Sequence, residues 1–559
     1  MKLNLAALAA LMMAALPLGA QVVTENAKPA EDILSTKASP VKTGPLTLPV
    51  ITWGGDVAAI LADMEGFDSA EGVDYTLKHE DDALKQAQSV LNGESPFFRG
   101  TMAQVLAVQP AFAKAGVPLV VLNQITWSNG GDTVVVRGDL KPADLKGKKI
   151  ALQLFGPHMD YVGTVLSSAG LSPRDVSFVW MKELTLPKYD TKGKAVDPVS
   201  AFGTDASIAA IAAISPDAAA LTSGGKVGTG SEGSVKDARI SLSTKTASKV
   251  IADVWAVRKD WLDANRDKAQ KIVHVLMRGQ EALADMSTQK GAKYQQLLSK
   301  SAELLFGTST MTADVEGMIS EAEFVSHAGN VQFFKAIGTL RNFNVLSEEI
   351  QTTLIGMGLM RGKTTLTHAE WDYAALAAGL KNTDTSALAS AKFDSAKLAS
   401  AIEAESTSWD SGTLFVVEIN FDPNQASFDA ARYAADYDKA LKLASTFGGA
   451  VVAVEGHSDP TGIEKAKAAG ENPLLVQQKE LAAKNLSLNR ANAVRASYLE
   501  YCKAKGLIVD ESQFLATGKG VSSPKFPQPK TRDEWSANRR VVFRVLNVEA
   551  EAADFTPSK

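Results

Sequence analysis

The stretch Thr133-Val-Val-Val-Arg-Gly-Asp-Leu-Lys-Pro-Ala-Asp-Leu-Lys-Gly-Lys-Lys-Ile-Ala-Leu-Gln-Leu154 decides the fold class. It holds two short apolar runs, 133–137 and 149–154, joined by a polar turn that contains Gly and Pro. Such runs, bounded by turn residues, are typical of buried strands. On both sides of this stretch, strand patterns alternate with helical patterns. Strands separated by helices of this length predict βα units and mainly parallel sheets.

The same alternation divides the chain into two modules. Before the opening stretch, the pattern predicts strands at 48–52, 73–77 and 120–124 and helices at 57–64 and 83–91. After it, residues 261–380 are mostly helical in pattern. Residues 381–411 are rich in Ala, Ser and Thr, a composition that indicates a linker. Beyond the linker, the pattern predicts strands at 414–421, 451–455 and 540–546 and helices at 430–447 and 486–505. The expected modules are therefore 46–380 and 412–548, with a polar lead at 21–45 and a polar tail at 549–559.

Composition excludes several classes of protein. The chain has 559 residues, with 58 Lys and Arg against 63 Asp and Glu, so its net charge is −5. This balance gives no electrostatic footprint for nucleic acid, and we expect no nucleic-acid partner. The single cysteine, Cys502, excludes an intramolecular disulfide, a CxxC redox pair and a thiolate zinc cage. A catalytic Cys502 remains an alternative, but its helical pattern favours a half-buried structural residue.

The first twenty residues predict export. Met1-Lys2 supplies a positive start, residues 3–16 are almost wholly Ala, Leu and Met, and Pro17-Leu-Gly-Ala20 ends the run with small residues. This is the layout of a secretory signal peptide (1–20) that is cleaved after Ala20. The alternative is an uncleaved membrane anchor, but the run is shorter than the roughly 20 residues that span a bilayer. No cysteine follows the run for lipid attachment, so the mature protein is expected in the periplasm and is not a lipoprotein.

Several segments of the first module carry a family resemblance. They are Thr52-Trp53-Gly54, Gly72-Val-Asp74, Asn92-Gly-Glu94 running into Phe98-Arg-Gly-Thr101, Val136-Arg137, Pro142–Ile150, Ser168-Ala-Gly-Leu171 and Asp253–Arg258. With these segments in this order, residues 46–380 resemble the substrate-binding proteins of ABC importers, in the branch with nitrate-, sulfonate- and thiamine-precursor-binding members. The resemblance implies an α/β two-lobed periplasmic binding protein fold (type II-like). Lobe one would comprise 46–135 and 245–380, and lobe two would comprise 140–240.

In such a fold the ligand lies in the cleft between the lobes, near strand ends and helix N-termini. The candidates for solute binding are Trp53, Thr101, Phe155, Gly156, His158, Thr222 and Ser223. The last two are expected to follow a strand at 218–221. For each candidate the alternative is ordinary turn chemistry, because these residue types populate βα turns in any case. The expected partners are a small-molecule ligand, with an anion among the options, and an inner-membrane ABC permease or another envelope protein.

An enzyme is not expected. The six histidines (His79, His158, His274, His327, His368 and His457) show no HxxxH or HxH spacing. No GxSxG, Walker A or GxGxxG motif stands between a strand and a helix. The sequence therefore predicts no catalytic residue, no cofactor and no metal site.

The second module carries its own motifs. They are Val454-Glu-Gly-His-Ser-Asp459, Leu486-Ser-Leu-Asn-Arg-Ala-Asn-Ala-Val494, Thr517–Gly520 with Pro524, and Asn538-Arg-Arg540. On these motifs residues 412–548 resemble the small α+β OmpA-like peptidoglycan-binding domain. The resemblance implies that Asp459 receives the ammonium of diaminopimelate and that Arg490 grips its carboxylate with two parallel hydrogen bonds.

The residues around this pair leave two readings open. Arg490, Val494 and Tyr498 stand at i, i+4 and i+8, so Arg490 should lie beside the core face of its helix. The alternative is a structural Asp–Arg pair that braces strand to helix. Residues 463–484 form an insertion relative to the family pattern, beside the expected pocket. The sequence thus predicts an exported, peptidoglycan-tethered solute-binding protein that serves an ABC-type importer. The alternative is a wall-anchored sensor or docking protein with no transport role.

Overall fold

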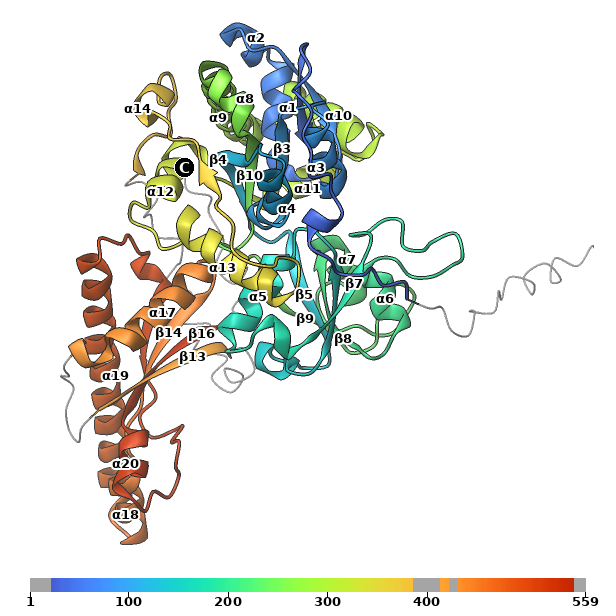
Figure 1. Cartoon of the computed structure of the whole chain (residues 1–559). Helices are drawn as coiled ribbons and strands as arrows, with labels where there is room; N and C mark the ends of the chain where they lie inside the picture. Colours follow the sequence, from blue (N-terminus) through green and yellow to red (C-terminus); the bar gives the residue numbers. More distant parts are fainter. Residues whose placement is uncertain (1–21, 386–412, 422–429, 547–559) are drawn as a thin grey trace, which may run out of the picture.

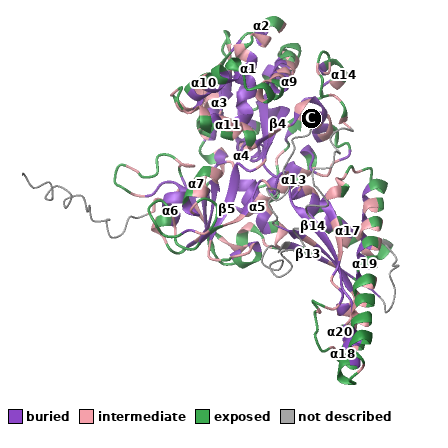
Figure 2. Ribbon diagram, turned by 180° about the vertical axis from the view of Figure 1, so that it is seen from behind, coloured by how far each residue is buried: buried purple, intermediate pink, exposed green. Residues whose placement is uncertain are grey.

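The computed structural model describes residues 22–385, 413–421 and 430–546 (Figure 1). The predicted signal peptide, the predicted tail and most of the predicted linker lie outside these residues. Within them, no helix has the length and hydropathy needed to cross a bilayer. Three larger sheets organise the described chain, two in the first module and one in the second. Figure 2 shows their buried strands between helices with exposed outer faces.

Lobe one is built on the sheet β11-β4-β10-β3, with β12 beside β4 and a separate parallel pair, β1 and β2. Its strands are β1 (Leu46–Val50), β2 (Tyr75–His79), β3 (Phe97–Thr101), β4 (Leu119–Ser128), β10 (Ala252–Arg258), β11 (Ala322–Phe324) and β12 (Thr367–His368). Its first helices are η1 (Ala30–Asp32), η2 (Gly54–Asp56), α1 (Val57–Met64), α2 (Phe67–Glu71), α3 (Ala83–Leu91) and α4 (Met102–Lys114). Later come α8 (Lys259–Ala264), α9 (Arg266–Gln289), α10 (Ala292–Phe306), α11 (Thr312–Ser320), α12 (Ser326–Lys335), α13 (Phe343–Gly356) and α14 (Tyr373–Leu376).

Lobe two is built on the sheet β7-β6-β8-β5-β9. Its strands are β5 (Asp132–Arg137), β6 (Lys149–Gln153), β7 (Ser177–Met181), β8 (Ile208–Ile214) and β9 (Ala238–Ser243). Its helices are η3 (Pro142–Leu145), α5 (Met159–Ser168), η4 (Pro173–Asp175), α6 (Pro198–Thr204) and α7 (Ser215–Leu221). The two strands expected in the opening stretch are therefore β5 and β6.

Two crossovers join strands of one lobe to strands of the other. The first crossover, residues 129–131, joins β4 to β5, and the second crossover, residues 244–251, joins β9 to β10. The expected limit of lobe one at residue 135 is therefore wrong, because β5 pairs with β8 and β9 in lobe two. Helix α13 packs against α4 of lobe one and α5 of lobe two, so it also spans the junction.

The sheets are mixed rather than mainly parallel as the alternation predicted. Strands β6, β7 and β8 are parallel neighbours, whereas β5 runs antiparallel to both β8 and β9. Likewise β10 runs antiparallel to β3 and β4. The reason is that β5 and β10 enter their sheets from the other lobe. The local alternation of strand and helix patterns in the sequence does not show which strand pairs with which after a crossover.

The second module has a sheet of order β13-β16-β14-β15. Its elements are β13 (Thr413–Asn420), η6 (Ala430–Tyr433), α17 (Ala434–Thr446), β14 (Val451–Gly456), α18 (Thr461–Ala468), α19 (Pro473–Ala504), η7 (Glu511–Gln513), β15 (Phe514–Gly518), α20 (Arg532–Asn538) and β16 (Arg540–Leu546). Helix α19 begins thirteen residues before the predicted 486, capped by the Asn472 side chain on the amide of Leu474. The insertion is therefore α18 together with the first turns of α19.

Candidate functional site

Trp53 lies at the lobe junction. It follows β1, and its indole Nε1 donates a hydrogen bond of 3.0 Å to Thr126 Oγ1 on β4. Its ring packs against the first crossover so closely that a Cβ added at Gly131 would lie 2.7 Å from ring atoms. Only a residue without a side chain fits there. Trp53 thus stands just after β1, at a strand end as predicted, and touches the first crossover.

A buried charge cluster lies behind Trp53. The Arg99 guanidinium on β3 donates to Asp56 (Nη2 to Oδ2, 2.8 Å) and to Asp253 (Nη1 to Oδ1, 2.8 Å). Thr126 Oγ1 donates to the other oxygen of Asp253 at 3.1 Å, which links the cluster to Trp53. Burial raises the pKa of Asp56 to about 6, although Arg99 opposes the shift. The two carboxylates and the guanidinium fix the strands and the helix start that carry them next to the junction. They do so because breaking a buried ion pair costs several kcal/mol.

The two crossovers are tied together by polar side chains. Asp132 accepts from Ser128 Oγ at 2.6 Å and lies 2.7 Å from His158 Nε2. Thr244, on the second crossover, lies 2.9 Å from Ser128 Oγ and accepts from the amide of Gly130 at 2.9 Å. His158 is fully buried, and its Nδ1 has no hydrogen-bond partner among the described residues. The predicted pocket residue His158 thus lies at the hinge between the lobes.

The turn after β6 meets lobe one directly. Thr101 caps α4 in a capping box with Gln104, and Gln104 Nε2 donates to the carbonyl of Phe155 at 3.0 Å. Phe155 has a φ of 57°, a left-handed conformation uncommon for a bulky residue. A Cβ added at Gly156 would lie 2.5 Å from Gln153 Oε1, so the turn needs glycine there. Three of the predicted candidates are therefore at or next to a contact between the lobes.

A second contact between the lobes comes from α7 and the end of α11. Ser215 Oγ, at the start of α7, donates to Glu321 Oε1. The Glu321 carbonyl accepts from the amide of Asn129 on the first crossover at 2.8 Å. Burial raises the pKa of Glu321, against the opposing effect of the Ser215 hydrogen bond. At this point the two lobes are in direct contact through the side chains of Ser215 and Glu321.

Thr222 and Ser223 lie away from the junction. Residues 218–221 belong to α7 and not to the strand that was expected, because β8 already ends at Ile214 and a Pro in the first turn starts the helix. Thr222 Oγ1 donates to the Ala218 carbonyl at 2.7 Å at the far end of α7, roughly 10 Å from Ser215 along the helix. In this region, Ser215 touches the other lobe through Glu321.

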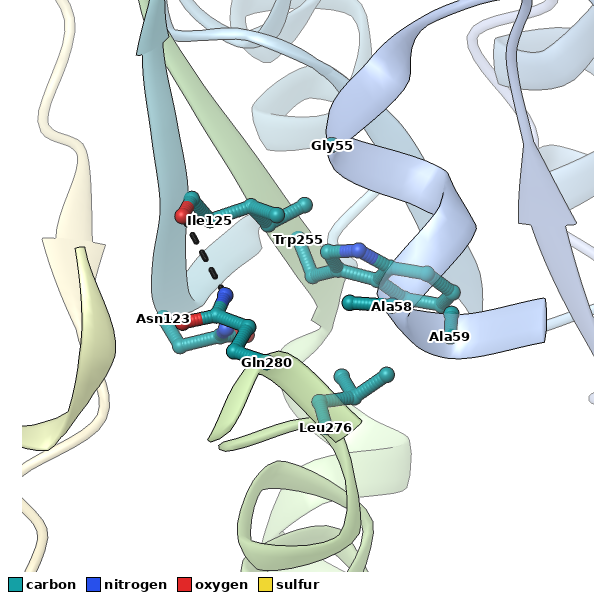
Figure 3. Close-up of a pocket in the computed structure, with 8 residues that line it drawn as sticks. All are labelled: Gly55, Ala58, Ala59, Asn123, Ile125, Trp255, Leu276 and Gln280. Carbon is teal, nitrogen blue, oxygen red and sulfur yellow. Dashed lines mark hydrogen bonds between the residues drawn. The ribbon is translucent and has the colours of Figure 1, made fainter. Parts of the chain in front are cut away.

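Two cavities among the described residues lie outside the junction. The cavity in Figure 3 has a volume of about 10 Å³, which is the size of a water molecule, and lies inside lobe one between α1, β4 and α9. Gln280 Nε2 donates to the Ile125 carbonyl at 3.2 Å beside it. A second cavity of about 240 Å³ lies beside β1, β2 and α3 and is lined by charges of both signs. Neither of these two cavities lies between the lobes.

The pair predicted to bind the wall lies where β14 ends. Asp459 Oδ1 accepts from the amide (3.0 Å) and the hydroxyl (2.7 Å) of Thr461. Arg490, on α19, is 1% exposed, and its Nη1 donates to the His457 carbonyl at 3.2 Å. As the spacing predicted, Arg490 shares the buried face of α19 with Val494 and Tyr498.

Arg539 lies close to both members of this pair and was not among the predicted site residues. Its Nη1 is 3.7 Å from Asp459 Oδ2. Burial and the nearby Arg539 lower the pKa of Arg490 to about 10, so Arg490 stays charged at neutral pH. The signal was present in the Asn538-Arg-Arg540 motif, which directly precedes the strand paired with β14. Two arginines and one carboxylate thus lie at the same end of the sheet.

The insertion stands beside this site. Helix α18 packs on the start of α19 through Ile463, Ala466 and Val476. In the first turns of α19, Leu474 and Leu481 are exposed. The insertion thus follows directly after the Asp459 end of β14 along the chain.

Comparisons with known proteins bear on the first module. The alkanesulfonate-binding protein SsuA from Xanthomonas axonopodis pv. citri bound to MOPS is 16% identical over 59% of this chain and 100% of its own, with a TM-score of 0.39. The periplasmic nitrate-binding protein NrtA from Synechocystis PCC 6803 is 14% identical over 66% of this chain and 90% of its own, with a TM-score of 0.39. A putative periplasmic sulfonate-binding protein SsuA from Methylobacillus flagellatus KT is 14% identical over 61% of this chain and 96% of its own, with a TM-score of 0.41. No curated protein matches the chain. Residues 57–288 match the family model described as NMT1/THI5 like, which agrees in part with the resemblance predicted for the first module.

Proposed function

We propose that the protein is a periplasmic solute-binding protein, tethered to peptidoglycan by its second module and serving an ABC-type importer. The observation that carries this proposal is the meeting of polar side chains from both lobes at the two crossovers. Asp132, His158 and Thr244 stand at the hinge, and Trp53 and Glu321 reach the junction from lobe one. The family match over residues 57–288 supports the same reading.

Binding requires the lobes to separate at the contacts described above. The hydrogen bonds from Gln104 to the Phe155 carbonyl and from Ser215 to Glu321 must break. A solute that enters then replaces these partners with its own polar groups and lets the lobes close again. Hinge closure around a ligand is the usual response of such a fold.

A thermal-shift screen of the full chain tests solute binding. The panel contains nitrate, alkanesulfonates and a thiamine-precursor pyrimidine, and native mass spectrometry of protein from its own periplasm adds unknown ligands. A solute at one hundred times its Kd should stabilise the protein by about 2.7 kcal/mol. Trp53→Ala should lose this shift, whereas Ser223→Ala, away from the junction, should keep it. If no compound shifts the transition and no ligand co-purifies, solute binding is wrong.

Wall attachment is proposed at the Asp459 end of β14. The full chain should co-sediment with purified peptidoglycan that contains diaminopimelate. Asp459→Asn and Arg490→Lys should each weaken binding roughly ten- to a hundred-fold, because a charge-assisted pair contributes about 1.5–3 kcal/mol. Lysine is used because Arg490 is buried and truncation would leave a cavity.

The matched control for wall binding is Arg495→Lys. Arg495 lies five residues further along α19, and its Nε donates to the Phe514 carbonyl at 2.8 Å. The control should sediment like the parent. If the Asp459 and Arg490 variants also sediment like the parent and remain folded by circular dichroism, the pair is structural and the anchoring proposal is wrong.

One observation favours a second candidate function, that of a wall-anchored sensor or docking protein. The lobes are closed through their own side chains, with Trp53 packed against Gly131. Such a junction needs no solute to stay closed. If the screen and mass spectrometry find no ligand while wall binding is confirmed, this second function replaces transport.

A further inference from the structure

The second module is in direct contact with the second crossover. The turn between α17 and β14 approaches it along the backbone. The amide of Gly449 donates to the Thr246 carbonyl at 3.1 Å, and the amide of Lys249 donates to the Thr446 carbonyl at 3.3 Å. These two hydrogen bonds run in opposite directions and fix the position of the turn against the crossover.

Gly449 allows this approach because it has no side chain. A Cβ at this position would lie 1.6 Å from the carbonyl oxygen of Lys245, much closer than any real contact. That oxygen is backbone, so it cannot move aside as a flexible side chain could. The docked arrangement therefore depends on glycine at position 449.

Side chains extend the interface to a helix that spans the lobes. Lys442 Nζ on α17 is 2.8 Å from Glu349 Oε1 on α13. Glu349 also pairs with Arg341 at 2.6 Å, and Arg341 Nε donates to the Lys249 carbonyl at 2.8 Å. The chain of contacts thus joins α17, α13 and the second crossover.

A third contact lies beyond α19. The amide of Ile508 donates to the Gly338 carbonyl, at 2.8 Å, in the loop before α13. A Cβ at Gly338 would lie 2.7 Å from the Ile508 side chain. All three contacts are on the hinge side of the first module.

The docked turn and the proposed wall site lie at opposite ends of β14. The turn precedes Val451, whereas Asp459 follows Gly456. Six residues of strand separate them by roughly 20 Å. The module can therefore hold the hinge at one end while its other end stays available.

We propose that the hinge face of the first module is an interaction surface for the second module, and that docking there is coupled to lobe closure. Opening the lobes must change backbone torsions in both crossovers, since they are the connections about which the lobes turn. A crossover fixed by two backbone hydrogen bonds resists that change. The docked module therefore favours closed lobes, and by linkage closed lobes favour the docked module. This coupling does not depend on the identity of any solute.

Native-state hydrogen exchange on the full chain, without added ligand, tests the coupling. Two amides report on motion at the two ends of the first crossover: Asn129, bonded to the Glu321 carbonyl of lobe one, and Ser215 of lobe two, bonded to the Gly131 carbonyl. Turning the lobes about this crossover twists its backbone and should open both hydrogen bonds. Gly449→Ala should release the module and speed exchange at both reporters at least about five-fold, the lower end of typical coupling. The control is Gly462→Ala, in the same module, where a Cβ meets nothing within 4 Å.

A second variant, which changes a charge in the interface instead of the backbone turn, tests the coupling if Gly449→Ala disturbs folding. Lys442→Glu places a negative charge against Glu349 and should also speed exchange at Asn129 and Ser215. Lys439→Glu, exposed on the same helix, should not.

Two results would overturn the proposal. In the first, the amides of Lys249 and Gly449 lose protection in the variants while Asn129 and Ser215 exchange at the parent rate. Docking would then exist without coupling. In the second, none of these amides changes in either variant, and the docked interface is then not formed in solution.

Discussion

Asp160 should make the stability of the protein depend on pH in a direction opposite to that of most carboxylates. It lies in the first turn of α5 and is 2% exposed. One oxygen accepts from the amide of Tyr161 at 3.0 Å, and the other has no partner among the described residues. Burial raises the pKa of Asp160 to about 8, against the weaker effect of Arg341.

The sign follows from comparing proton binding in the two states. The unfolded carboxyl titrates near 3.8, so between that pH and about 8 the folded state holds a proton that the unfolded state has released. The contribution to stability is fully present below pH 3.8 and is lost as the pH rises through about 8. At about 1.36 kcal/mol per pKa unit, this window of about four units corresponds to at most on the order of 5 kcal/mol.

Urea unfolding at pH 5, 6.5 and 8 measures the effect. Asp160→Asn keeps the shape of the side chain and removes the charge, so its free energy of unfolding should fall less than that of the parent as the pH rises. The control is Asp267→Asn, an exposed aspartate in the first turn of α9. If the parent and Asp160→Asn lose stability in parallel over this range, Asp160 is not held as a neutral acid and the reasoning is refuted.

Three further predictions concern the first lobe and the second module. Arg99→Leu should lower the free energy of unfolding by about 3–5 kcal/mol, since it leaves Asp56 and Asp253 buried without their partner; a loss below 1 kcal/mol in urea titration would contradict this. Thr101→Ala removes the cap of α4 and should cost about 1 kcal/mol by the same assay, and an unchanged midpoint would show that the capping box is dispensable. Cys502 is fully buried and burial raises the pKa of its thiol, so a thiol reagent should modify it only after unfolding; rapid modification of the native protein would count against this placement.

Elements with strong local signals were predicted closely. The helices at 57–64 and 83–91 and the strand at 540–546 have the bounds that their patterns indicated. In the second of these helices, Asp82 accepts from two backbone amides of the first turn, a capping signal that is visible in the sequence. Local patterning and capping are sufficient for such elements.

Pairing across the crossovers could not be predicted in the same way. The antiparallel entry of β5 and β10 depends on which sheet each strand joins after it leaves the other lobe. For residues 218–221 the sequence predicts a strand, because a run of only four apolar residues has no periodicity that distinguishes a strand from a helix. Long-range pairing decides these cases.

In the candidate site too, residues with a local sequence signal were predicted and residues brought together by the fold were not. Trp53 could be predicted because an aromatic residue at a strand end beside two glycines is a local signal. The cluster of Arg99, Asp56 and Asp253 was missed, since its members are 43 and 154 residues apart and look like surface charges in the sequence. Only the fold brings them together and removes them from water.

The contact at Gly449 has a consequence for how the protein is produced and assayed. A fragment that ends near residue 385 would lack the turn that meets the Thr246 carbonyl and the Lys249 amide. Both groups would face water, and the surface around Gly338 would lose its cover. Affinities measured on such a fragment would describe a looser receptor than the intact chain, so screening campaigns and crystallisation trials should keep both modules together.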